Sequence, residues 1–152
     1  MSEPRRLYAP SIPAAGARLE LDLDAARHVR VLRLRAGDRV VLFDGRGLDA
    51  DAVLEQVEPG LVTCAIERLH PRTGHGARVV LVQALPKGSK LEEIVRAATE
   101  AGATAIHLAI AERSIARPDE DRARGRLDRL SKIAQEAARQ SERAELPAIV
   151  PP

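Results

Sequence analysis

The first half of the chain consists of short apolar runs that turn residues interrupt. The runs cover residues 39–43, 48–57 and 61–69, with Asp-Gly and Pro-Gly pairs between them. Turn residues between runs of this length are typical of β-hairpins. In the last run apolar side chains recur at every second position, which suits a strand with one buried face. The pattern predicts a small antiparallel β-barrel.

One helix is predicted within this half, from Asp24 to about Leu34. Ala25, Val29 and Leu32 fall on one stripe at helical spacing, and Asp24 is a suitable N-cap. The same segment is rich in arginine. The pattern therefore predicts one helical insertion among the strands of the barrel.

The apolar pattern changes its period after residues 71–76, a run with two glycines and a proline that is predicted to link two domains. Residues 79–85 and 105–111 are continuous apolar runs that suit buried strands, and residues 90–101 have helical spacing. Gly102 supplies the stop of that helix. This β-α-β order predicts a parallel sheet that is covered by helices and connected by right-handed crossovers.

The end of the chain is predicted to hold one long helix and the start of a third strand. The helix runs from the acidic residues at 119–121 to about Arg143, and residues 146–152 begin the strand. The predicted fold class is therefore α/β. The inner stripe of the helix is expected to consist of Leu127, Leu130, Ala134, Ala137 and Ser141.

Composition adds limits to this picture. The 24 basic residues nearly balance 22 acidic ones, so the formal charge is only +2 and RNA contact would need local clusters. Tyr8 and Phe43 are the aromatic residues, too few for a base-stacking surface. Cys64 lies in an apolar context that suits a buried side chain, and no metal site is expected. Without a signal core or an apolar run of about 18 residues, a cytoplasmic location away from membranes is expected.

The candidate chemistry of the second half lies at the ends of the predicted elements. Lys87 and Lys90 flank a glycine between a strand and a helix, where cations and backbone N–H groups can bind a phosphate or carboxylate. The alternative is two solvated lysines on a turn. Glu112 and Arg113 follow the second strand, as part of a site or as an ordinary ion pair. The residues at the end of the long helix, Gln140 to Arg143, either face a site or simply suit the helix dipole.

The arginines of the first half suggest contact with a phosphate backbone. Arg27 and Arg30 share one helix face, with Arg33 near them. The alternative is a solvated charged face. His28 is expected to be an ordinary helix histidine, since no metal or catalytic partner accompanies it. A further pair of charges, Asp49 and Asp51, alternates on one strand and is expected to face water.

Several of these segments together resemble the ribosomal RNA small subunit methyltransferase E family. The resemblance runs through residues 28–38, residues 83–92, Glu100-Ala101-Gly102, residues 112–114 and residues 140–143. It implies a PUA-like RNA-binding barrel over residues 1–74 and the first half of a SPOUT-type parallel α/β domain over residues 75–152. The chain departs from the family pattern at three positions, Ala97, Ala111 and Arg139.

The resemblance implies methylation of uridine N3 in small-subunit (16S) rRNA, with S-adenosylmethionine as cofactor, the small ribosomal subunit as partner and a homodimer in the full-length family. The family's knot signatures, such as a Gly-Pro-Glu-Gly-Gly loop, do not occur in these residues. The chain is therefore expected to be an incomplete form, inactive alone, with its catalytic residues elsewhere and an apolar edge exposed. The alternative is a non-catalytic RNA-binding module. By resemblance, Arg5, Arg6, His28, Arg30 and Arg33 would bind RNA, and Lys87, Lys90, Glu92, Glu112, Arg113, Gln140 and Arg143 would line the half-site.

Overall fold

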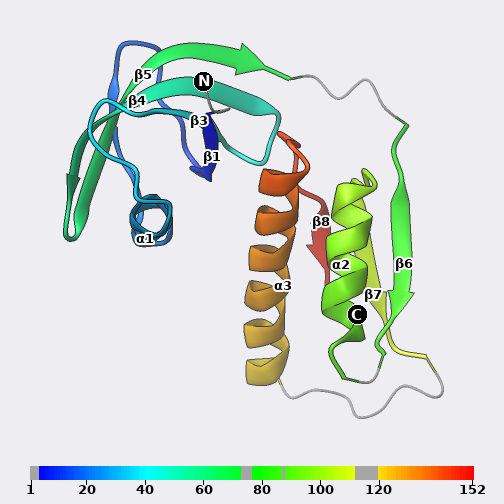
Figure 1. Ribbon diagram of the computed structural model, residues 1–152. Coiled ribbons are helices and arrows are strands. Elements are labelled where there is room, and N and C mark those ends of the chain that lie inside the picture. Colours follow the sequence, from blue (N-terminus) through cyan, green and yellow to red (C-terminus); the bar gives the residue numbers. More distant parts are fainter. Residues whose placement is uncertain (1–3, 73–76, 87, 112–119) are drawn as a thin grey trace. The chain divides into compact units, whose positions relative to one another are not determined.

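The computed structural model describes residues 4–72, 77–86, 88–111 and 120–152 (Figure 1). The chain divides into two compact units, residues 1–74 and 75–152, and each has its own hydrophobic core. The units are described separately below. The α/β class predicted from the sequence is confirmed.

The first unit contains one five-stranded sheet in the order β1-β3-β4-β5-β2. The predicted antiparallel pairing holds for three of its ladders, but β1 and β3 pair in parallel. The two longest strands, β4 and β5, form the central hairpin, which curves along its length (Figure 1). The strands are β1 (Arg5–Tyr8), β2 (Arg18–Glu20), β3 (Arg39–Phe43), β4 (Leu48–Glu58) and β5 (Leu61–Pro71).

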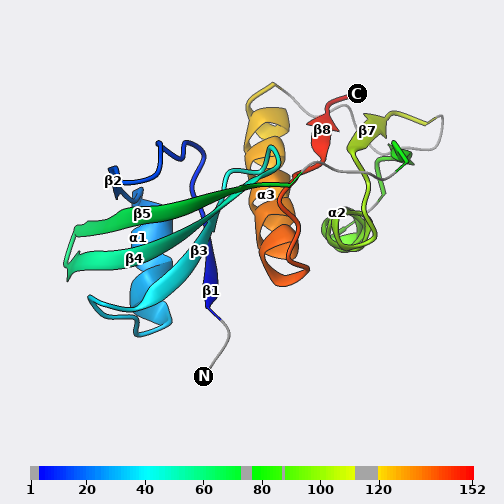
Figure 2. The same ribbon diagram turned by 90° about the horizontal axis from the view of Figure 1, so that it is seen from above.

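Helix α1 (Leu23–Val31) lies along one face of this sheet (Figure 2), and the core of the first unit lies between the two. Alternate residues of β5, Val62, Cys64 and Ile66, are buried as the alternating pattern predicts. Burial raises the pKa of the Cys64 thiol to about 11, so the side chain behaves as a small hydrophobe. Small residues of α1 complete the core and allow the helix to approach the sheet closely.

Helix α1 is shorter than predicted, and its N-cap is Asp22 instead of Asp24. The Asp22 Oδ1 atom accepts a hydrogen bond of 2.8 Å from the backbone N–H of Ala25, which satisfies one of the first N–H groups of the helix. The helix ends at Val31 because Arg33 has a positive φ of 57°. The backbone N–H of Leu34 then bonds to the carbonyl of Val29, as in a Schellman motif.

The second unit is a three-stranded parallel sheet in the order β6-β7-β8 with two helices. Because the strands follow in sequence order, two crossovers of the same hand place both helices on the same face of the sheet. The shared core contains Leu91 and Val95 of one helix, Leu130 of the other and Ile106 of the central strand. The elements are β6 (Val80–Ala84), α2 (Lys90–Glu100), β7 (Ala105–Ala109), α3 (Glu120–Gln140) and β8 (Ala148–Val150).

Both helices end where the backbone adopts a positive φ. Gly102, with a φ of 100°, follows α2 as predicted. Helix α3 ends at Gln140, earlier than predicted, because Glu142 has a φ of 57° and the N–H of Arg143 bonds to the carbonyl of Ala138. Ser141 consequently lies outside the helix and is exposed, whereas Ala134 and Ala137 are buried as predicted.

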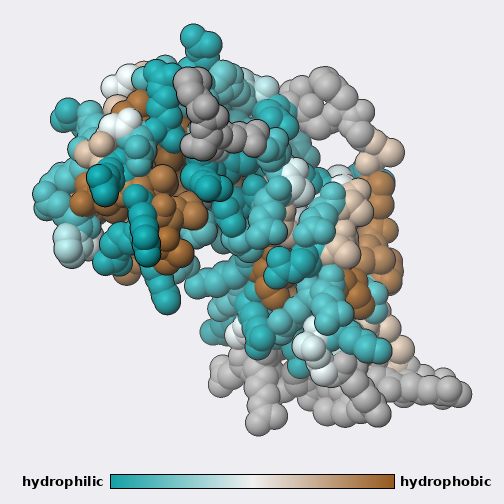
Figure 3. Space-filling model, in the orientation of Figure 1, coloured by the Kyte–Doolittle hydropathy of each residue, from teal (hydrophilic) through white to brown (hydrophobic). Residues whose placement is uncertain are grey.

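The opposite face of the parallel sheet is open in the described part of the chain. Val80 and Val82 of β6 point to this face, and Val82 is 70% exposed. The prediction of a buried strand is therefore wrong for β6, which exposes apolar side chains on this face (Figure 3). Among the described residues, no helix has both the length and the apolar character that a membrane span requires.

The position of the α1 cap can be tested with two matched substitutions. Asp22→Ala should lower the free energy of unfolding by about 1 kcal/mol, because the partly buried backbone N–H group of Ala25 loses its acceptor. Asp24→Ala, in the first turn, should have a smaller effect of about 0.5 kcal/mol through the helix dipole. Urea denaturation followed by the fluorescence of Tyr8, which is the chain's one tyrosine, reports on this unit. A larger effect at Asp24 would contradict the assigned cap.

Candidate functional site

The first unit carries exposed arginines on the outer face of α1. Arg27 and Arg30 are exposed, while Ala25, Ala26 and Val29 on the opposite face are buried. Two apolar side chains flank these arginines, Leu23 at 78% and Val31 at 69% exposed. The outer face of α1 is therefore both cationic and apolar, a combination suited to phosphates and to nonpolar parts of a nucleotide.

The other cations predicted to bind RNA occupy different positions. Arg33 is exposed directly after α1, and Arg5 is exposed on β1, at the edge of the sheet. His28 is half-buried on α1, in agreement with an ordinary helix histidine. Arg5, Arg30 and Arg33 are thus accessible, but they come from two elements and do not form one continuous row.

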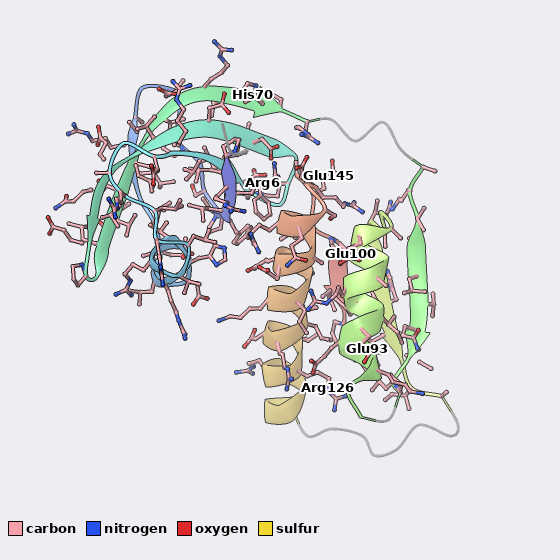
Figure 4. The ribbon with its side chains drawn as sticks, viewed as in Figure 1. Arg6, His70, Glu93, Glu100, Arg126 and Glu145 are labelled. Atoms are coloured by element: carbon pink, nitrogen blue, oxygen red, sulfur yellow. The ribbon has the colours of Figure 1, made fainter. Side chains whose placement is uncertain are left out.

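Arg6 has a different environment, because its guanidinium group forms a buried ion pair with Asp49. The Nη1 and Nη2 atoms of Arg6 lie 2.8 and 3.1 Å from the two carboxylate oxygens of Asp49. The Arg6 side chain, which is labelled in Figure 4, is 10% exposed. It stacks over the ring of Phe43 at 4.9 Å, and that ring also contacts Tyr8. Arg72 adds a second cation, 3.5 Å from Asp49.

This cluster corrects the expectation that Asp49 faces water. The residue is 3% exposed, because Arg6 of β1 and Phe43 of β3 lie against it on the same side of the sheet. A buried carboxylate requires paired charges and hydrogen bonds, which the two arginines supply. Arg6 therefore joins strands β1 and β4, and its buried guanidinium group is poorly placed for contact with RNA.

The carboxyl edge of the parallel sheet carries one group of the predicted half-site residues. Lys90 is exposed at the start of α2, and Glu92, two residues later, forms an ion pair of 2.9 Å with Arg129 of α3. Gly88 precedes the helix with a φ of 68°. The predicted residues Lys87, Glu112 and Arg113 lie outside the described residues.

Gln140 and Arg143 lie at the opposite, amino edge of this sheet. The Nη1 atom of Arg143 donates a hydrogen bond of 2.9 Å to the carbonyl of Thr99, in the last turn of α2. Its position also explains Gly102, because a Cβ atom there would lie only 3.3 Å from the same guanidinium nitrogen. Gln140 bonds to Glu136, within its own helix.

The structure therefore does not bring the described half-site residues together. Helix α2 has 11 residues and a length of about 16 Å, which separates Lys90 and Glu92 from the Arg143 contact. Figure 4 shows this separation, with Glu93 and Glu100 toward opposite ends of α2. Ligands of parallel α/β sheets bind at the carboxyl edge, so the function of Arg143 seen here is to fix the end of α2.

Sequence reasoning did not identify several residues that the structure connects to the site. Arg129 forms an ion pair with Glu92, and Arg72 forms one with Asp49. The backbone carbonyl of Thr99 accepts a hydrogen bond from Arg143. Each contact joins residues at least 23 positions apart in the sequence. Helical and strand periodicity cannot predict contacts between residues so far apart. Within the described residues, no group of three or more His, Cys, Asp or Glu side chains could hold a metal ion.

Comparison with protein families identifies the class of protein. Residues 74–152 match a family model described as an RNA methyltransferase domain, and residues 21–67 match an RNA methyltransferase PUA domain. The first match covers more than half of the chain, with the parallel sheet and both of its helices. The chain therefore belongs to this RNA methyltransferase family.

The curated relatives agree with the resemblance seen in the sequence, which is confirmed. Ribosomal RNA small subunit methyltransferase E of Bacillus subtilis is 36% identical over 123 residues, covering 80% of this chain and 48% of that protein. The Synechocystis protein of the same name is 39% identical over 123 residues, covering 81% of this chain and 39% of that protein. The chain spans about half the length, or less, of these relatives.

Solved structures show the same fold over nearly the whole chain. A ribosomal RNA small subunit methyltransferase E from Neisseria gonorrhoeae, bound to S-adenosyl methionine, superposes with a TM-score of 0.92 at 31% identity. The match covers 98% of this chain and 62% of that one. A putative methyltransferase from Legionella pneumophila, in complex with the same cofactor, gives a TM-score of 0.93 at 27% identity, with 99% and 63% coverage.

The Asp49 cluster makes a testable prediction for stability. Asp49→Ala should lower the free energy of unfolding of the first unit by about 3 kcal/mol, because it leaves the buried Arg6 guanidinium without its carboxylate. Glu55→Ala removes a surface pair with Arg18 and should change stability by less than about 1 kcal/mol. Urea denaturation of both variants measures the difference. Equal effects would show that burial of the Arg6–Asp49 pair is not important.

Proposed function

We propose that this chain serves the methylation of uridine N3 in small-subunit (16S) rRNA, with S-adenosylmethionine as methyl donor. The main support is the fold match over 98% of the chain to a ribosomal RNA small subunit methyltransferase E structure bound to that cofactor, at 31% identity. The names of the curated relatives support the rRNA substrate. The small ribosomal subunit in the cytoplasm is then the partner, and a homodimer is the proposed assembly of the full-length protein.

In this proposal the first unit holds the RNA. Arg27 and Arg30 on the outer face of α1, with Arg5 and Arg33 nearby in the same unit, supply the phosphate contacts. Because the unit has few aromatic residues, binding would depend on the shape and backbone of the RNA instead of base stacking. Arg6, buried in its ion pair with Asp49, would stabilise the sheet instead of contacting the RNA.

The second unit would contribute part of the methyl-transfer site at the carboxyl edge of its sheet. Lys90 is an exposed cation at a helix start, a position that suits a carboxylate or phosphate group of a ligand. Glu92 is held in place by Arg129. By resemblance Lys87, Glu112 and Arg113 would belong to the same edge, whereas Gln140 and Arg143 would act by positioning α2 and α3.

The proposed reaction needs more than these residues supply. S-adenosylmethionine would supply the methyl group that N3 of uracil receives, while N3 loses its proton. Alignment of the methyl group with N3 is a large part of such catalysis. The knot motifs that hold the cofactor in the family do not occur in the 152 residues. We therefore expect these residues alone to bind RNA without transferring methyl groups.

RNA binding without catalysis is the second candidate function. It is favoured by the contrast between the two units, since the first has a closed core and an exposed cationic helix, whereas the sheet of the second has an open apolar face. Cofactor binding by the full-length protein distinguishes the two functions, because only methylation requires it.

The RNA-binding role of α1 predicts a change in salt dependence. The double substitution Arg27→Ala and Arg30→Ala should weaken binding to a fluorescein-labelled rRNA hairpin and reduce the slope of log K against log salt by about 0.7 to 0.9 per lost phosphate contact. Arg18→Ala, an exposed arginine on β2, is the matched control and should leave the slope unchanged. Fluorescence anisotropy at several salt concentrations measures both. An unaltered slope in the double variant would remove α1 from the RNA surface.

The proposal that these residues form only part of the cofactor site predicts the outcome of a cofactor titration. Isothermal titration of the 152-residue chain with S-adenosylmethionine should show no saturable binding, because the described residues supply only one edge of the site. The full-length Neisseria gonorrhoeae protein, whose structure contains this cofactor, is the positive control. Tight binding by the 152-residue chain would contradict the proposal that these residues form only part of the cofactor site.

A further inference from the structure

The fold brings together the two aromatic side chains of the sequence, Tyr8 of β1 and Phe43 of β3. Their ring centroids lie 5.4 Å apart, with the ring planes tilted by 59°. The two residues are partners in the parallel ladder between β1 and β3, so their side chains lie on the same face of the sheet. Because the neighbouring residue Leu7 points into the core beside α1, the aromatic pair lies on the opposite face.

The two rings differ in exposure. Phe43 is fully buried, whereas Tyr8 is half-buried. The guanidinium group of Arg6, labelled in Figure 4, lies 4.9 Å from the centroid of the Phe43 ring and is held by its ion pair with Asp49. Phe43 is therefore fixed in position and supports the Tyr8 ring from behind, while the exposed part of Tyr8 is accessible to a ligand.

Arg46 extends from the turn between β3 and β4 to the segment that follows Tyr8. Its Nη2 atom donates a hydrogen bond of 2.5 Å to the carbonyl of Pro10, and its Nε atom lies 3.6 Å from Asp44. The Asp44 carboxylate also accepts hydrogen bonds from the backbone N–H groups of Arg46 and Leu48, which fixes the turn. The Arg46 side chain is nevertheless 72% exposed. An anchored and accessible cation is thus present beside Tyr8.

Arg72 brings a second accessible guanidinium group to the same face. Asp49 is the partner of Phe43 in the ladder between β3 and β4, and the Nη1 atom of Arg72 lies 3.5 Å from its carboxylate. The backbone N–H of Arg72 bonds to the carbonyl of Gly47, the residue after Arg46. The Arg72 side chain is 53% exposed. Two exposed cations therefore accompany the aromatic pair.

The phenol group of Tyr8 is compatible with a phosphate nearby. Partial burial raises its pKa, and the positive charge of Arg46 opposes this only in part. The carboxylates of Asp44 and Asp22 raise the pKa further. The phenol is therefore neutral at physiological pH and does not repel an anion.

Tyr8 is also connected to the outer face of α1. Strand β1 is an edge strand of its sheet, and Asp22, which influences the pKa of Tyr8, is the N-cap of α1. The next residue, Leu23, is 78% exposed, and Arg27 follows one turn later on the outer face of the helix. One RNA strand that passes around the β1 edge can therefore contact both Tyr8 and α1.

We propose that one unstacked nucleotide of the RNA binds here, with its base on the Tyr8 ring and its phosphates at Arg46 and Arg72. Stacking on aromatic side chains is a general feature of single-stranded RNA recognition and tolerates every base. A surface that follows several bases would need more aromatic residues, but a single stacking position needs one ring. The inference rests on the proposed function, since rRNA supplies the nucleotide, and it adds a base contact to the phosphate contacts of α1.

The ring signals of Tyr8 report directly on stacking, because Tyr8 is the one tyrosine of the chain. NMR titration of the 152-residue chain with a short single-stranded oligoadenylate should shift the Tyr8 ring-proton signals upfield, since the ring current of a stacked purine shields them. Tripolyphosphate offers negative charge without a base and should cause no such shift. Unshifted Tyr8 signals at saturating oligoadenylate, or an equal upfield shift with tripolyphosphate, would overturn the proposal.

Two substitutions of Tyr8 separate the aromatic ring from the hydroxyl group. Tyr8→Phe keeps a ring and should bind the oligoadenylate with a Kd within about twofold of the original, whereas Tyr8→Leu should raise the Kd about tenfold. Circular dichroism checks that both variants fold, and the ring shift in the original chain decides the question if Tyr8→Leu does not. Equal Kd values for two folded variants would show that the base does not stack on Tyr8.

The phosphate contacts are tested through the salt dependence of oligoadenylate binding. Arg46→Ala and Arg72→Ala should each weaken binding and reduce the slope of log K against log salt by about 0.7 for each lost phosphate contact. Arg18→Ala, an exposed arginine on β2, is the matched control and should keep the slope. A slope that stays the same in all three variants would overturn the phosphate contacts proposed for Arg46 and Arg72.

The failure of this inference can be distinguished from the failure of the proposed function. If the rRNA hairpin binds with the salt dependence expected for α1 while the Tyr8 signals do not shift, the stacking site fails and the RNA-binding role stands. If the oligoadenylate stacks on Tyr8 but the hairpin does not bind, the nucleotide site stands and the proposed rRNA function fails. An oligoglutamate peptide that binds here as tightly as the oligoadenylate would show recognition of negative charge alone and overturn the proposal.

Discussion

The handedness of the crossovers is the constraint on which the second unit depends. Three parallel strands in sequence order, joined by crossovers of one hand, place α2 and α3 on the same face of the sheet. This arrangement gathers the helix starts at the carboxyl edge, with Lys90 and Glu92, and the helix ends at the amino edge, with Arg143. It also leaves the opposite face, with Val80 and Val82, exposed.

The first unit depends on close packing between a short helix and a curved sheet. Small residues bring α1 against the sheet, so its arginines point outward, and the turn at Arg33 ends the helix. The other side of the sheet is held by the Arg6–Asp49 pair. The outer face of α1, which is proposed to contact RNA, depends on this packing, because Ala25, Ala26 and Val29 turn the opposite face of the helix to the core.

Much of the fold could be predicted from local patterns. The alternation in β5, the helical spacing in α2 and the stop at Gly102 each depend on neighbouring residues, and the structure contains all three. The end of α1 could not be predicted in this way, because it depends on a non-glycine residue, Arg33, adopting a positive φ. The candidate site was less predictable, since Gln140 and Arg143 lie far from the half-site residues described at the carboxyl edge.

By itself the sequence determined the α/β class, the order of the helices and strands from α1 onward and the family resemblance, because spacing and short motifs are properties of neighbouring positions. Strands β1 and β2 were not predicted. Only the tertiary structure decided which charges are buried and which are available. Arg6 and Arg30 are the same residue type, yet one is enclosed by Asp49 and Phe43 and the other is exposed. The partners come from strands distant in sequence, and the electrostatic environment of a side chain depends on those neighbours in space.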